Sequence, residues 1–142
     1  MQEASSPGNL RVVSGSVDES IRQTEAGVGF SFPTDYIRFA RESGGSGTAG
    51  WFGEMYLMLF PIGDLAVLHR VHNDAEHMPG FVAFGSDGGG ELFGFDFRAS
   101  PPLIVMVGNV SSGWSDAIVQ ATSFDEFMDK RRRGEPFDFS TE

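Results

Sequence analysis

The chain has 142 residues, a mass of 15.4 kDa and a formal net charge of −10, with 40% hydrophobic residues and no Cys. This length matches one domain of the common ~100–150 residue size, and the apolar content excludes a wholly disordered chain. The lack of cysteine excludes a disulfide scaffold, Cys-ligated zinc and thiol catalysis.

The start of the chain is rich in Ser, Pro and Gly and has few apolar residues. Residues 1–15 are therefore predicted to form a flexible leader, followed by a single domain over residues 16–142. This start has no apolar stretch typical of a secretory signal, and no run approaches the ~18 apolar residues of a membrane span. We expect a cytoplasmic protein that makes no membrane contact.

The charge is unevenly distributed along the chain. Four of the ten basic residues lie in Lys130–Arg133, so the preceding 129 residues carry six bases against 17 acids, a net charge of −11. Such a surface repels nucleic-acid phosphates and anionic lipid, and it attracts a basic protein. Because acidity also promotes solubility in general, charge alone leaves both interpretations open.

Two helices are expected in the N-terminal third. The first covers Asp18–Ala26, where two acids suit the positive end of the helix dipole. The second opens at Pro33 and Asp35, a proline and an acid typical of a first helical turn. The stretch Gly44–Gly53 holds five glycines and is predicted to be a loop.

Strands dominate the middle of the chain. Glu91–Arg98 is the clearest of them, because Phe93, Phe95 and Phe97 fall on one face by the period of two. Asp64–His77 has helical spacing instead. Further strands are expected over Glu54–Pro61, Phe81–Phe84, Leu103–Val107 and Ala117–Thr122, with a turn over Gly85–Gly90.

The last predicted helix starts at a capping box formed by Ser123 and Glu126, and it stops at Gly134. Its basic run Lys130–Arg133 complements the C-terminal end of the helix dipole, which we favour over a nucleic-acid contact. The elements together predict an α+β single domain with a mostly antiparallel central sheet flanked by helices.

Three groups of residues are candidates for chemical sites. His69, His72 and Glu76 share one side of a helix, but they lack a recognised metal motif, so we expect no metal. The glycines of the turn do not form a phosphate loop, because the motif's lysine is missing and acids flank it. We expect no cofactor. Acid pairs among Asp87, Glu91 and Asp96 leave a small carboxylate-dependent hydrolase as a less favoured alternative.

Several segments occur in a familiar order. FGSDGGGE at Phe84–Glu91 and FDFR at Phe95–Arg98 resemble an "F-G-S-D-G-G-G-E" turn followed by an "F-D-x-R" strand. FPTDY at Phe32–Tyr36, with Phe39, resembles an "(L/F)P-x-D-Y-x-x-F" helix, and SFDEF at Ser123–Phe127 resembles a closing "S-F-x-E-F" helix. Gly44–Gly45 stands where the same pattern has "N-G-G", with Ser43 in place of Asn. Over about residues 18–134, the chain resembles the SUKH superfamily.

The resemblance implies an α+β fold around a central sheet and a non-enzymatic role. Bacterial members are typically immunity proteins that bind and neutralise polymorphic toxins, often nucleases, whereas the yeast branch contains regulators of cell-wall synthesis and signalling. We therefore expect an immunity protein that occludes a cognate toxin, a nuclease with a basic cleft, after electrostatic steering. A regulatory or scaffold module is the alternative.

The candidate toxin-binding residues combine acids with aromatic anchors, because interface hot spots favour Trp, Tyr and Arg. Each also has a structural interpretation, either as a core cap or as turn chemistry. The expected partner is a basic protein toxin, with no direct nucleic-acid contact, and the chain itself is expected to be a monomer or weak homodimer. The candidates are Trp51, Glu54, Asp87, Glu91, Asp96, Trp114 and Asp116.

Overall fold

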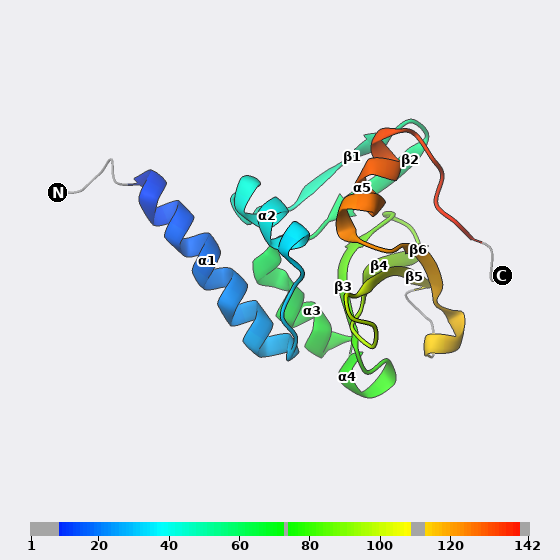
Figure 1. Ribbon diagram of the computed structural model, residues 1–142, viewed down its shortest axis with the longest axis horizontal. Helices are drawn as coiled ribbons and strands as arrows, with labels where there is room; N and C mark the ends of the chain where they lie inside the picture. Colours follow the sequence, from blue (N-terminus) through cyan, green and yellow to red (C-terminus); the bar gives the residue numbers. More distant parts are fainter. Residues whose placement is uncertain (1–8, 73, 109–112, 140–142) are drawn as a thin grey trace.

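The sheet is antiparallel throughout, and its spatial order follows the chain, β1-β2-β3-β4-β5-β6. The computed structural model describes residues 9–72, 74–108 and 113–139 (Figure 1). The predicted α+β class with an antiparallel sheet is confirmed. The strands are β1 Thr48–Phe52, β2 Met55–Leu59, β3 Phe81–Ser86, β4 Glu91–Asp96, β5 Leu103–Gly108 and β6 Ile118–Ala121.

The helices lie mainly on one side of this sheet. α5 crosses one sheet face, and α1 and α3 lie side by side beside the sheet (Figure 1). Short 3-10 turns η1 and η2 precede α3 and β6. The bounds are α1 Asn9–Val28, α2 Thr34–Glu42, η1 Ile62–Asp64, α3 Leu65–Val71, α4 Asp74–His77, η2 Trp114–Asp116 and α5 Phe124–Arg132.

The first helix is longer than the sequence predicted. α1 begins at Asn9 instead of Asp18, so residues 9–15 are helical, while residues 1–8 lie outside the described residues. Val17, Ile21, Thr24 and Val28 are buried along it at three- and four-residue spacing. In the sequence, Leu10 and Val13 continue the same spacing, a signal that the Ser and Gly content obscured.

The predicted loop over Gly44–Gly53 is wrong, because it contains strand β1. All five β1 residues pair with β2, from Thr48 opposite Leu59 to Phe52 opposite Met55. At Gly47, an added Cβ would lie 2.4 Å from the Leu59 carbonyl oxygen. The glycine there permits close backbone approach, a role that composition alone cannot separate from loop formation.

The single helix predicted over Asp64–His77 is divided. η1 leads into α3, α4 follows at Asp74, and residue 73 lies outside the described residues. On α3, Leu65 and His69 are buried, whereas His72, which follows the helix, is exposed.

A cluster of aromatic rings forms the core between the sheet and the helices. Tyr36 of α2 meets Phe95 of β4 at 5.2 Å and Phe124 of α5 at 5.0 Å between ring centroids, and Phe84 meets Phe95 at 4.9 Å. Edge-to-face and tilted pairs of this kind contribute beyond simple burial of area. The predicted inward face of β4 is confirmed, since Phe93 is also fully buried in this cluster.

A second, smaller hydrophobic cluster lies on the other face of the sheet. Phe81, Ala83, Val105 and Val107 are buried there together with Met78, which precedes β3. Phe60, Leu92, Trp114 and Ala117 pack against this second cluster as partly buried side chains.

The capping box of α5 is confirmed. The Ser123 hydroxyl accepts a hydrogen bond from the Glu126 backbone N–H at 3.0 Å. The Glu126 carboxylate accepts from the backbone N–H of Thr122 at 2.6 Å and from its hydroxyl at 2.9 Å, and these bonds lower the pKa of Glu126. The carboxylate thus reaches one residue before the cap.

The basic run at the end of α5 does more than complement the helix dipole. Arg131 is only 1% exposed, and its guanidinium lies 5.0 Å from the Phe127 ring centroid and 4.5 Å from that of Phe137. Phe137 in turn packs against Phe93 at 4.6 Å. Arg131 therefore helps to fix the segment after α5 onto the core, a role that the charge pattern did not reveal.

Candidate functional site

The structure divides the seven candidate residues between the two ends of the β3–β4 hairpin. Asp87 and Glu91 flank the β3–β4 turn, and the neighbouring β1–β2 hairpin carries Trp51 and Glu54. Asp96, Trp114 and Asp116 lie at the far end of β4 or beside it. A six-residue strand spans roughly 20 Å, so the two groups form separate surfaces.

An aromatic pair stands on the β1–β2 hairpin. Trp51 is 69% exposed, and its ring meets that of Tyr56, the residue directly opposite it, edge-on at 5.2 Å. The Tyr56 ring lies against the backbone of Gly88 in the β3–β4 turn, where an added Cβ would come within 2.8 Å. Gly88 also has φ +80°, so glycine is required both by the close approach of the Tyr56 ring and by the backbone conformation.

Sequence reasoning missed Tyr56. The signal was available, because Gly53 and Glu54 form a two-residue connection between two short strands, which places Trp51 opposite Tyr56.

Asp87 organises the β3–β4 turn. Its Oδ1 accepts hydrogen bonds from the backbone N–H groups of Gly89 at 2.8 Å and Glu91 at 3.1 Å. The Ser86 hydroxyl accepts from the Gly88 N–H at 2.9 Å. One carboxylate oxygen of Asp87 is thus committed to turn geometry, as expected for an Asp in a tight connection.

Glu91 and Trp51 lie on different faces of the sheet. Glu91 is two and four residues from Phe93 and Phe95, so all three side chains project from the helix-covered face. Tyr56 is adjacent to Leu57, which is buried on that face, so Tyr56 and its partner Trp51 lie on the other face. Burial raises the pKa of Glu91 above its ordinary value, and the nearby Asp87 charge raises it further. The Glu91 carboxylate is therefore a charge that the fold tolerates at a cost.

The destabilisation of the folded state by ionised Glu91 leads to a prediction about thermal stability. Glu91→Gln is expected to raise the melting temperature slightly at pH 7, because ionised Glu91 disfavours the folded state. Since the folded-state pKa lies above 4.5, the penalty is full above that pKa and absent well below pH 4.5, so the gain shrinks as pH falls. Thermal melts of wild type, Glu91→Gln and the control Glu42→Gln between pH 7 and pH 3 measure it. A gain that grows towards low pH contradicts the assignment.

At the other end of β4, Asp96 holds Arg98 in place. Asp96 is 6% exposed, its two oxygens accept from Arg98 Nε and Nη2 at 3.0 Å each, and Oδ1 also accepts from the Arg98 backbone N–H at 3.0 Å. The Arg98 guanidinium lies 3.6 Å from the Trp114 ring centroid. The predicted contact residue Asp96 is therefore buried and engaged within the chain.

Trp114 is fixed by further contacts. Its indole N–H donates to the Pro79 carbonyl at 2.9 Å, and its ring meets Phe81 edge-on at 6.0 Å. Asp116 follows in the same 3-10 turn and is exposed. Trp114 thus closes the second cluster, consistent with the core-cap interpretation of this tryptophan.

The described residues contain no group of three His, Asp or Glu side chains placed to hold a metal ion. The predicted His69–His72–Glu76 trio does not share a surface, because His69 is buried and His72 is exposed. None of the helices in the described ranges is long and apolar enough to cross a membrane.

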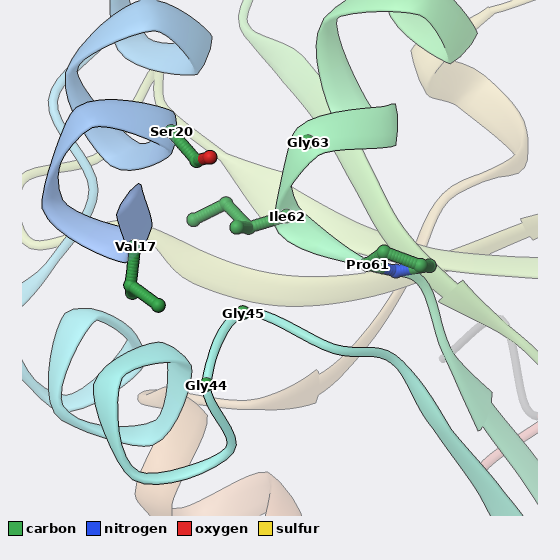
Figure 2. A pocket seen from close by; sticks show the side chains of 7 residues that line it. All are labelled: Val17, Ser20, Gly44, Gly45, Pro61, Ile62 and Gly63. Carbon is green, nitrogen blue, oxygen red and sulfur yellow. The ribbon is translucent and has the colours of Figure 1, made fainter. Parts of the chain in front are cut away.

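A hollow of about 310 Å³ lies between α1, the end of α2 and η1 (Figure 2). No lining residue carries a titratable side chain. The backbone N–H groups of Gly45 and Ile62 already donate, to the Ala40 and Gly45 carbonyls. The hollow therefore offers little to orient a small polar ligand. Its lining is Val17, Ser20, Gly44, Gly45, Pro61, Ile62 and Gly63.

A comparison with known protein families decides which family the chain belongs to. The model of the SMI1 / KNR4 family (SUKH-1) matches residues 16–130. The chain belongs to this family. No curated protein matches the chain. The match in this SUKH-1 protein covers all seven candidate residues, whereas Arg131 and Phe137, which pack together after the start of α5, lie beyond it.

Proposed function

We propose that this SUKH-1 protein is an immunity protein that binds a cognate toxin and neutralises it by occlusion, without catalysis of its own. Family membership supports a protein-binding role of this kind. The observation that carries it is Trp51, a large aromatic side chain held exposed on the Tyr56 ring at the projecting end of the sheet. An exposed, preordered aromatic anchor is typical of a protein-binding hot spot.

The charge of the chain supports a basic target. The net charge of −10 includes Glu54 and Asp87 in the two turns beside Trp51. A nuclease toxin must hold phosphate, so its active cleft carries basic groups. An acidic inhibitor is steered to such a cleft and covers it, which gives the fast capture that protection of a cell requires.

Co-expression tests the proposal. The tagged full-length protein is purified from its host, and a stoichiometric co-purifying chain is identified by mass spectrometry. That chain is expected to stop growth when expressed alone and to be harmless beside this protein. Several weak, non-toxic partners would instead support a regulatory or scaffold module.

Salt dependence tests the electrostatic part. The association rate with the identified toxin is expected to fall about tenfold or more from low to high salt, while the dissociation rate changes less. Stopped-flow measurements over a salt series give both rates. An association rate that is indifferent to ionic strength would remove steering from the proposal.

A further inference from the structure

The two edges of the sheet are finished differently. At β6, the Gln120 side chain donates to the Asp138 carbonyl at 2.7 Å and accepts from the Asp138 N–H at 2.9 Å. The Gln120 backbone carbonyl accepts from Lys130 Nζ at 2.9 Å. This edge is thus occupied by the chain's own C-terminal segment. At the opposite edge, β1 pairs with β2 alone among the residues that the structure describes.

Within the described part of the chain, β1 carries none of the usual protections of an edge strand. Its sequence, TAGWF, has no charge and no proline, and its pairing with β2 is continuous without a bulge. Natural edge strands are normally protected by lysine, proline, bulges or a covering segment, because their free N–H and C=O groups attract another strand. An unprotected edge beside an exposed tryptophan is therefore a feature that needs a function.

The hairpin also projects from the sheet. β2 pairs with β3 only through Met58 and Leu59, although all five residues of β1 pair with β2. The outer part of the hairpin, including Trp51 and Tyr56, extends beyond these pairs. The contact of Tyr56 with Gly88 supports it from the β3–β4 turn. A partner strand can therefore approach the β1 edge beside an exposed aromatic ring.

Charge decides which occupant fits this edge. A second copy of the chain would bring a net charge of −10 against a net charge of −10, which opposes pairing. Glu54 and Asp87, in the turns at this end, favour a basic segment. We infer that the β1 edge accepts an extended, basic segment of a partner protein by strand addition, with an apolar side chain of that segment packed on Trp51. This inference deepens the proposed function, with the toxin as the partner.

Selected peptides test the inference without a known toxin. Short linear peptides of random sequence are displayed and selected on the immobilised full-length protein. The enriched peptides are expected to combine basic and apolar residues and to slow hydrogen exchange of residues 48–52. Failure to enrich any peptide, or protection confined to other segments, would overturn the inference, as would a dimer formed through β1 in solution.

Matched variants sharpen the test. Ala49 is exposed and lies on the same strand face as Trp51. Ala49→Lys is expected to weaken binding of the enriched peptides at least about tenfold, through edge protection and charge repulsion, whereas Ala49→Glu retains it. Trp51→Ala is expected to cost a similar factor. Equal binding by Ala49→Lys and Ala49→Glu, with the fold intact by circular dichroism, would contradict a basic occupant.

The two proposals fail in different ways. If a toxin is identified but protects a surface other than residues 48–52, strand addition is wrong and the immunity function stands. If basic peptides protect β1 but no partner is toxic, the docking edge stands and the immunity function is wrong.

Discussion

Phe95→Ala is expected to lower the free energy of unfolding by about 3–5 kcal/mol, among the largest effects of any single substitution in this protein. Phe95 is fully buried at the centre of the ring cluster, with Phe32, Tyr36 and Phe84 at 5.8, 5.2 and 4.9 Å between centroids. Its truncation leaves a cavity among rings from the α1–α2 connection, α2 and β3. Those rings cannot all move inward to fill it.

Urea unfolding followed by circular dichroism measures this loss. For a chain of this length it corresponds to a fall in melting temperature of roughly 10–20 °C. Phe95→Leu retains most of the side-chain volume and is expected to cost less than half as much. If the alanine variant does not fold, the free energy of unfolding of Phe95→Leu is compared with that of wild type instead. Phe139→Ala is the control, because Phe139 is 61% exposed. A loss below about 1 kcal/mol at Phe95 would show that the cluster repacks.

The parts of the fold that the sequence predicted are those with a repeating local signal. The alternation of Phe93, Phe95 and Phe97 predicted the buried face of β4, and the Ser123–Glu126 cap predicted the start of α5. In both cases the physical cause lies within a few residues of the chain. Local patterns of this kind are independent of the rest of the fold.

The errors share a different cause. β1 was predicted as a loop because its strand state depends on pairing with β2, and Gly47 faces the Leu59 carbonyl, which no local pattern contains. Arg131 was predicted only as part of a basic run that complements the helix dipole, although Phe127 and Phe137 enclose it. Tertiary contacts determine the structure at both places, so composition and charge alone led to wrong or incomplete predictions.

Only part of the arrangement of the seven candidate residues could be predicted from the sequence. The sequence identified Trp51 and the acids of the two turns, but it could not divide the candidates between the ends of the β3–β4 hairpin. Nor could it place Trp51 and Glu91 on different faces, because the faces follow from the register of β1 with β2 and of β4 with β5. Sequence patterns therefore supplied candidate residue types for binding, and the sheet topology determines which of them lie together.

Asp96→Ala is expected to lower the free energy of unfolding by about 2 kcal/mol while leaving the Trp51 surface intact. The substitution removes the acceptor of three hydrogen bonds from Arg98, and with it the support of the guanidinium over Trp114. Breaking a fully buried ion pair costs about 3–5 kcal/mol. The smaller value applies here because the Arg98 side chain is 54% exposed, so water solvates the cation that remains.

Urea unfolding combined with the two indole N–H resonances tests this assignment. The Trp114 signal, whose N–H donates to Pro79, is expected to shift, whereas the Trp51 signal stays in place. Asp96→Asn keeps an oxygen for the Arg98 backbone N–H and is expected to cost less than Asp96→Ala. Asp129→Ala, which breaks the exposed pair with Arg132, is expected to stay within about 0.5 kcal/mol of wild type. If Asp96→Ala left stability unchanged but abolished partner binding, Asp96 would belong to an interface, and the network that places it inside the fold would be wrong.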